Sequence, residues 1–513
     1  MRKYLSAIAA AGAIAGTALL AAPSGAETLK MGVRGLPPGQ GNPYTGRGIP
    51  HVFIWTTFFD SLTLLGKGGV VEPDLADSWS VSADHLTWTF KLKPGIKFSN
   101  GEPLNAASIK ATFDWLMTEQ GGATVIGKNL APVVASANVV DDLTVTITTK
   151  TPNPTTPREM VAVHIVEPKA WKDLGVEGFA KKPIGTGPYV LDYFKPGEAA
   201  VAARPDMANT YRPITGNVTR IEYFELPEGA AREAALLSGQ THVDNGIADD
   251  SIPNLKAAGM VIDTVFAGRT LGITLVSSKN GQPVDGPMSN VKVRQALNYA
   301  VNKQAIVDEI YGGNAVIASQ AATNNAFGFN PNVKPYAYDP AKAKQLLAEA
   351  GYANGFEFEV QAVASNPQFT LVYQSAVQDL EAVGIKASLQ AQPFADWLKH
   401  WLAGDWPYPA FGFGHDLSGN LDAGRSFTQY TSCMKNPPYY CNEDEMPLVK
   451  AQAEEFDVAK REALLQELLA KNAANAPIIF LTQGTESMAH SPKVKNFQQL
   501  NQVLNYEHMT IEK

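Results

Sequence analysis

Alternating apolar and polar residues predict a strand near the start of the chain. Residues 86–92 alternate large apolar side chains with threonine and lysine, a period of two that is typical of a strand with one buried face. Pro94-Gly95 then turns the chain, and Asn105 precedes apolar residues at helical spacing over 109–117. Because asparagine is a good N-cap, the pattern predicts a unit of strand, turn and capped helix.

Strand and helix patterns continue to alternate along the chain. Residues 143–148 predict a second strand beside 86–92, and together the two predict a small sheet-based subdomain. Further along, strand patterns at 356–360 and 385–389 flank a helical pattern over 372–383. Repeats of strand, helix and strand are typical of an α/β lobe.

Three parts of the sequence contain distinctive motifs. Residues 73–79 with 94–106, residues 183–191 and residues 291–303 resemble signatures of the extracytoplasmic solute-binding proteins of peptide-type ABC importers. The resemblance covers nearly all of the chain after residue 26. It implies an α/β, two-lobed periplasmic-binding-protein type II fold of cluster C, with an extra small subdomain in the first lobe.

The resemblance also implies a domain organisation. A chain of 513 residues is longer than one compact domain usually grows. We expect residues 27–266 to form lobe I, with the extra subdomain at about 70–180. Lobe II is expected at 267–480, and residues 481–513 return to lobe I.

The first 26 residues have the features of a secretory signal. Arg2 and Lys3 precede an apolar stretch, and Ser24-Gly25-Ala26 offers a small-residue cleavage site. We expect cleavage after Ala26, with an uncleaved anchor as the alternative. No cysteine lies nearby to carry a lipid, so the sequence predicts a freely diffusing periplasmic protein.

Charge and cysteine content restrict the partners. The formal net charge is −8 and no Lys/Arg cluster is present, which argues against nucleic acid or an anionic membrane surface as a partner. Cys433 and Cys441 are the two cysteines. In an oxidising compartment they are expected to form a disulfide, although a metal or redox pair is an alternative. No metal or other cofactor is expected.

Four candidate ligand-binding residues lie between residues 44 and 269. Tyr44 and Arg47 belong to a long loop after the first strand, and such loops often carry binding residues. Asn245 follows a short acidic strand, and Arg269 lies where the resembling fold first crosses between lobes. Structural roles, such as a helix cap for Asn245 or a carboxylate partner for Arg269, remain alternatives.

The remaining candidates lie in the aromatic-rich segment 394–430. Trp406, Phe413, His415 and Asp416 combine aromatic and polar side chains, as small-molecule pockets do, although the rings could instead fill the core. The resemblance implies that Asp416 pairs with the amino terminus of a peptide through a charge-assisted hydrogen bond. Two features depart from the family. The family's usual Asp-Pro-Asp-Asn sequence is replaced by Ser-Gly-Asn-Leu-Asp at residues 418–422. Residues 364–368 lack the arginine that dipeptide binders often place there.

The sequence therefore predicts a monomeric, non-enzymatic binding protein. It would capture a small solute, above all an oligopeptide, by closure of two lobes and deliver it to an inner-membrane ABC permease. A non-peptide solute, such as a sugar conjugate or an opine, is one alternative. A secreted hydrolase is another, because five histidines could act as general bases. No Gly-x-Ser-x-Gly or His-Glu-x-x-His motif supports it.

Overall fold

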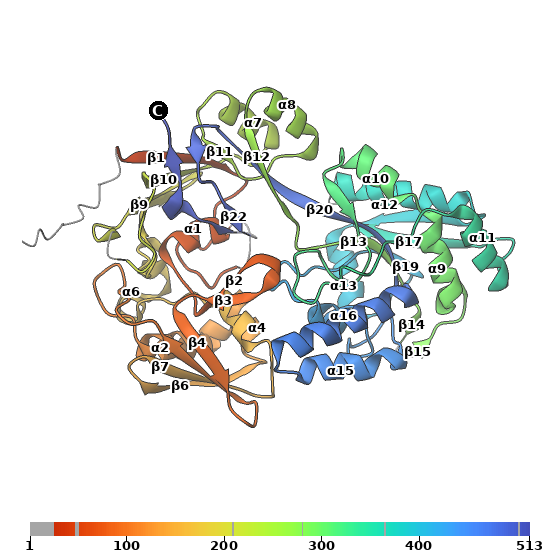
Figure 1. Ribbon diagram of the computed structural model, residues 1–513, viewed down its shortest axis with the longest axis horizontal. Helices are drawn as coiled ribbons and strands as arrows, with labels where there is room; N and C mark the ends of the chain where they lie inside the picture. The colour runs from red at the N-terminus through yellow and green to blue at the C-terminus, as the bar shows by residue number, and fades with distance from the viewer. Residues whose placement is uncertain (1–24, 47–50, 208–209, 280, 364–365, 501–502) are drawn as a thin grey trace, which may run out of the picture.

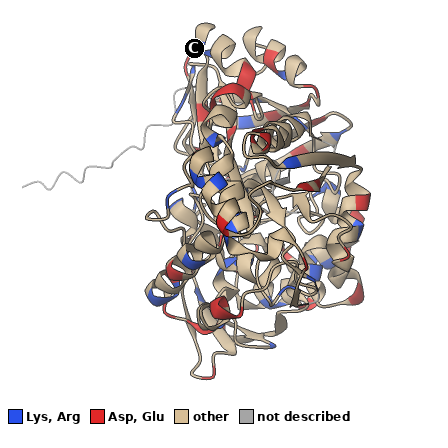
Figure 2. Cartoon of the chain, turned by 90° about the vertical axis from the view of Figure 1, so that its right-hand side faces the viewer, with Lys and Arg blue, Asp and Glu red and all other residues tan. Residues whose placement is uncertain are grey.

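The computed structural model describes residues 25–46, 51–207, 210–279, 281–363, 366–500 and 503–513. These residues form two lobes that lie side by side in Figure 1, and one long strand, β20 (Ile478–His490), runs from one lobe into the other. In the described part of the chain no helix is both long and apolar enough to cross a membrane. Lysines, arginines and acidic residues are interspersed along the chain (Figure 2).

Lobe I is built on a sheet that brings the start and the end of the chain together. Residues 27–33 form a strand that is parallel to the strand at residues 218–225. The next two strands of the sheet, at residues 198–203 and 189–195, are each antiparallel to the strand before them. Its strands run in the order β11 (Val243–Asp244), β1 (Glu27–Val33), β10 (Val218–Glu225), β9 (Glu198–Ala203) and β8 (Tyr189–Lys195). Helices α1 (His51–Phe58) and α7 (Gly229–Leu237) belong to this lobe.

The expected small subdomain is a four-stranded antiparallel sheet. Its strands run in the order β4 (Ala76–Val81), β5 (Thr87–Leu92), β7 (Thr144–Thr149) and β6 (Val134–Asp141). Helix α2 (Ala106–Leu116) packs on it and is capped by Asn105, whose Oδ1 accepts from the Ser108 amide at 3.1 Å. Thr87 pairs with Thr148, which confirms the predicted strands and their pairing.

Lobe II has the predicted alternation of strands and helices. β17 (Glu357–Val363) and β18 (Lys386–Gln392) are parallel and are joined by α12 (Pro367–Glu381). The sheet continues through β19 (Ala410–Gly412) and β13 (Leu271–Leu275) to β20. Its covering helices include α9 (Val291–Ala300), α10 (Lys303–Ile310), α11 (Pro340–Glu349) and α16 (Val458–Asn475).

Two segments connect the lobes. The first runs from β12 (Val261–Phe266) through residues 267–270 to β13. The second is β20, which pairs with β13 and β16 (Ala315–Ile317) over residues 478–484 and with β12 over residues 485–490. One strand therefore belongs to the sheets of both lobes, and its middle lies between them.

The lobes also meet through a buried ionic cluster, which we call the seam cluster: Arg158, Asp422 and Arg461. Arg158 lies on α5 (Thr156–Glu159) of lobe I, and its Nε is 3.2 Å from Asp422 Oδ2 in lobe II. Arg461, on α16, contacts both carboxylate oxygens of Asp422 at 2.7 and 2.8 Å. All three side chains are less than 10% exposed. The cluster is thus fully paired across the two lobes.

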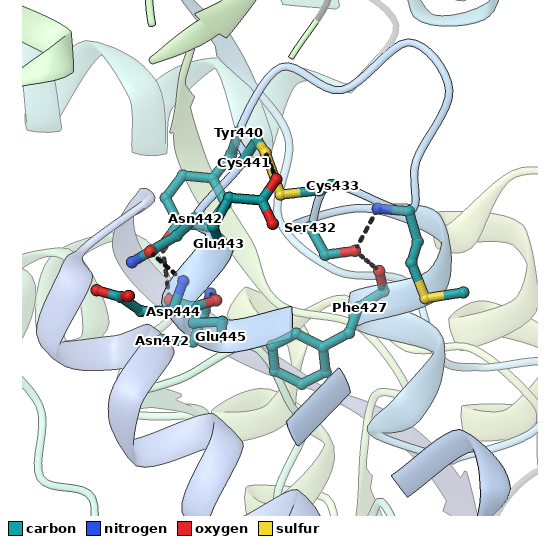
Figure 3. Close-up of a disulfide and its surroundings, with 11 residues drawn as sticks. Phe427, Ser432, Cys433, Tyr440, Cys441, Asn442, Glu443, Asp444, Glu445 and Asn472 are labelled. Atoms are coloured by element: carbon teal, nitrogen blue, oxygen red, sulfur yellow. Dashed lines mark hydrogen bonds between the residues drawn. A yellow bond between two sulfur atoms is a disulfide. The ribbon is translucent and has the colours of Figure 1, made fainter. Parts of the chain in front are cut away.

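The predicted disulfide between Cys433 and Cys441 is confirmed. Figure 3 shows the loop that it closes, flanked by Ser432, whose hydroxyl donates to the Phe427 carbonyl. On the other side, Glu445 accepts from the Tyr440 hydroxyl at 2.7 Å and from Asn472 at 2.9 Å. The disulfide excludes a role for these two sulfurs as thiolate metal ligands.

Candidate functional site: a cavity between the lobes

A cavity of about 1260 Å³ lies between the lobes. Lobe I contributes residues that follow β1 and β11, and lobe II contributes the end of α10, the start of α12 and the segment after β19. Both connecting segments also line it, including residues 484–488 of β20. Because its wall comes from two bodies and from the strand that joins them, a bound molecule would contact both lobes.

Asn245 presents an unused hydrogen-bond donor to this cavity. It is 7% exposed, and its Oδ1 accepts from the Arg34 amide at 3.2 Å. Its Nδ2 has no partner in the described part of the chain. A buried donor without a partner costs about 1–3 kcal/mol. A ligand oxygen would satisfy it.

Arg269 and Asp416 are adjacent because two loops run together across the lobe boundary. The two residues form a β-bridge, and the Leu417 amide donates to the Gly268 carbonyl at 2.7 Å. A Cβ atom on Gly268 would lie 2.5 Å from the Ser418 Cα. Only glycine therefore permits this approach.

Three arginines line the cavity without a carboxylate partner. Among the described residues, Arg34, Arg269 and Arg425 have no acidic oxygen within 4.0 Å. The Arg269 guanidinium lies over the Phe369 ring at 5.4 Å, and Arg425 Nε donates to Gln429 at 2.9 Å. Since a guanidinium is well suited to bind a carboxylate in bidentate fashion, these groups can receive ligand anions.

Acidic groups line the same cavity. Burial raises the pKa of Glu486, which lies on β20, while Arg269 and Arg34 act to lower it and Asp416 to raise it further. Burial also raises the pKa of Asp249, which accepts from Gln368 Nε2 across the lobes at 3.1 Å. Charges of both signs are thus available to a zwitterionic molecule.

The structure brings three of the predicted residues, Asn245, Arg269 and Asp416, to the cavity. Tyr44 instead lies in the core of lobe I, where its hydroxyl donates to the His164 carbonyl at 3.0 Å. Arg47 lies outside the described residues.

The other three predicted residues belong to a buried aromatic cluster beside Asp416. Trp406 stacks on Phe411 with ring centroids 3.8 Å apart, and Phe413 packs against Trp401. His415 is 1% exposed, neither ring nitrogen has a partner in the described chain, and burial lowers its pKa to about 3. None of the three lines the cavity.

Sequence reasoning missed Arg34, Gln368 and Glu486, which also line the cavity. Two of them had a usable signal. Arg34 comes directly after β1, and ligands of open α/β sheets bind beyond the carboxyl ends of strands. Glu486 places a charge in a long strand whose first residues are apolar. Gln368 gave no signal of this kind.

Comparisons with known proteins agree with this architecture. The family model for bacterial extracellular solute-binding proteins, family 5, matches residues 70–437. The glutathione-binding protein GsiB of Shigella boydii serotype 4 is 30% identical in an alignment of 369 residues that covers 68% of this chain and 67% of that protein.

Solved structures share the fold over nearly the whole chain. HbpA2 from Haemophilus parasuis has a TM-score of 0.84 and 25% identity, and the match covers 95% of this chain and 100% of that one. The periplasmic binding protein DppA from Helicobacter pylori, in complex with peptide STSA, has a TM-score of 0.70 and 22% identity, with 95% and 98% covered. This protein therefore belongs to the bacterial extracellular solute-binding proteins of family 5, and it is an extracytoplasmic binding component of an ABC importer rather than an enzyme.

Proposed function

We propose that this protein captures a small peptide, of the charge type of glutathione, in the cavity between its lobes. The observation that carries the proposal is the set of unpaired groups there: arginines for carboxylates, acidic residues for an ammonium and the free Asn245 amide. The relatives named as glutathione-binding and the neighbour in complex with peptide STSA support this choice.

Asn245, Arg269 and Asp416 are the predicted residues to which we assign ligand contacts. Asp416 Oδ1 accepts from the Ser418 amide at 3.0 Å, while no hydrogen bond to its Oδ2 is found among the described residues. That oxygen can accept from the amino terminus of a peptide, and Arg269 can hold a carboxylate. The cavity of about 1260 Å³ exceeds the usual range for a drug-sized ligand, roughly 300–1,000 Å³, so it leaves room for a peptide.

Binding would act through lobe closure. A ligand that contacts both lobes favours the closed arrangement by its differential affinity for that state. The permease would then receive the loaded protein. No covalent step is required.

Calorimetric titration with glutathione, trialanine and maltose tests the proposal. We expect a dissociation constant in the micromolar range or below for at least one peptide and no heat with maltose. Native mass spectrometry of protein purified without denaturation is the second arm. A retained non-peptide mass, such as an opine or a sugar conjugate, together with no peptide binding, would overturn the proposal.

We further propose that the mature protein begins at Glu27 and diffuses in the periplasm as a monomer. Strand β1 starts at Glu27, directly after the expected cleavage site. The cysteines lie far away, at 433 and 441. Residues 1–24 lie outside the described residues. Amino-terminal sequencing and size-exclusion chromatography of the periplasmic fraction test cleavage after Ala26 and the oligomeric state.

A further inference from the structure

Glu486 stands out among the acidic groups of the cavity because of its place in the fold. It lies in the middle of β20, within the stretch where that strand leaves the sheet of lobe II and enters that of lobe I. Its backbone pairs with Val265 of β12. Strand pairing therefore fixes the backbone both before and after this residue. Its side chain lines the cavity from a well-defined backbone position.

This carboxylate is half-buried and has no hydrogen bond or ion pair within the described chain. Burying a charge without a partner is unfavourable, and a carboxylate placed in this way on a cavity wall is a candidate ligand-binding group. Asp249, by contrast, accepts from Gln368, and Asp416 accepts from the Ser418 amide. Glu486 accepts no hydrogen bond from any described residue at either carboxylate oxygen.

The surroundings of Glu486 indicate which ligand group it would receive. Arg34 and Arg269 are close enough to lower its pKa, and Asp416 is close enough to raise it. A ligand ammonium between the two carboxylates would relieve their mutual repulsion. The arginines beside them would stay available for the ligand's carboxylates.

We propose that Glu486 is a specificity-determining residue, a second acceptor, together with Asp416, for the ligand's ammonium group. Asp416 comes from lobe II and Glu486 from the strand that joins the lobes, so one ammonium bridges the two. The proposal rests on the proposed function, because it needs a ligand that carries a free amine. It adds a residue that neither the sequence motifs nor the comparisons assign.

The test is a cycle that combines protein variants with ligand variants. Binding of glutathione and of its N-acetyl derivative is measured by calorimetry for the wild type, Glu486→Gln and Glu486→Asp. Acetylation removes the ammonium charge and leaves the carboxylates. We expect it to weaken binding to the wild type at least tenfold. In Glu486→Gln we expect this penalty to fall at least threefold, because one of the two acceptors is gone.

Controls separate a direct contact from general electrostatics. Glu486→Asp keeps the charge but shortens the side chain by one methylene, so we expect an intermediate acetylation penalty. Glu357→Gln removes a carboxylate that is 71% exposed on β17 and does not line the cavity. We expect it to leave the penalty unchanged. Circular dichroism of each variant verifies the fold.

The outcomes distinguish the two proposals. An acetylation penalty that is the same, within twofold, in Glu486→Gln and the wild type overturns the role of Glu486. Equal binding of both ligand forms by the wild type also overturns it but leaves peptide capture intact. If the wild type binds neither glutathione nor trialanine, the proposed function itself fails, and this inference fails with it.

Discussion

Two places where charges of lobe I and lobe II approach each other differ in how completely those charges are paired. In the seam cluster, Asp422 contacts Arg158 and Arg461 within 3.2 Å. At the cavity, Arg34, Arg269 and Glu486 have no oppositely charged side chain within 4.0 Å in the described chain. Buried charge that is already paired serves the structure, whereas unpaired charge facing a cavity is available to a ligand.

The pKa values show the same contrast. Burial alone would raise the pKa of Asp422, but Arg461 and Arg158 outweigh it and hold the pKa below 3.8. For Glu486 burial prevails over the two arginines, and the pKa lies above 4.5. The paired carboxylate is thus ionised more readily in the folded protein than in the unfolded chain, and the unpaired carboxylate less readily.

The largest expected effect comes from breaking the seam cluster. Asp422→Asn leaves two buried arginines without a counter-charge, so we expect a loss of about 3–5 kcal/mol in the free energy of unfolding. Urea unfolding at pH 7 measures it. The matched control, Asp416→Asn at the cavity, should change stability by about 0.5 kcal/mol or less. Equal losses in the two variants would contradict the distinction between the regions.

The sequence predicts more of the fold than of the ligand-binding site, because the fold leaves local patterns in the sequence and the site does not. Alternation over 86–92 and the N-cap at Asn105 are local patterns, and both are confirmed. Tyr44 belongs to a long loop of the kind that often binds ligands, but long-range packing places its side chain in the core of lobe I. Whether a polar residue faces a cavity depends on contacts between distant segments.

Gly268 illustrates this dependence. Its missing side chain lets the loop before β13 contact Ser418, about 150 residues later in the sequence, and that contact puts Arg269 beside Asp416. No periodic pattern encodes such a pairing. The residues with an unusual place in a regular element, such as Glu486 in β20, were the ones that sequence reasoning could have found.

At the cavity, removing a charge should affect affinity more than stability. Arg269→Met keeps much of the side-chain volume and removes the guanidinium. We expect glutathione affinity to fall about 10- to 100-fold, which corresponds to about 1.4–2.7 kcal/mol, with stability changed by about 0.5 kcal/mol or less. Calorimetry and urea unfolding on the same preparation measure both. Unchanged affinity would remove Arg269 from the site.

Glu486→Gln should stabilise the ligand-free protein at pH 7. Because the folded-state pKa is raised above 4.5, this group's contribution to stability is fully present below pH 4.5 and is lost as the pH rises through the folded pKa. Glutamine has no proton to lose. We expect a gain of about 1 kcal/mol at pH 7 and none at pH 4 by urea unfolding. A variant that is less stable than the wild type at pH 7 would show that the carboxylate is already well paired.

A similarly small change in stability should come from the hydrogen bond that crosses the cavity. Gln368 Nε2 donates to Asp249 at 3.1 Å. The Asp249 carboxylate is therefore less fully paired than Asp422 in the seam cluster but better paired than Glu486. Gln368→Ala should cost about 0.5–1.5 kcal/mol in urea unfolding of the ligand-free protein, because the half-buried carboxylate loses a donor.

Gln345→Ala provides the matched control. That residue makes the same type of bond, to Glu349 at 2.8 Å, but on the exposed surface of a single helix. The loss there should be close to zero, since water replaces the donor. If both variants lose the same amount, the contact between the lobes adds nothing to an ordinary local hydrogen bond, and Asp249 should then be grouped with the unpaired charges of the cavity.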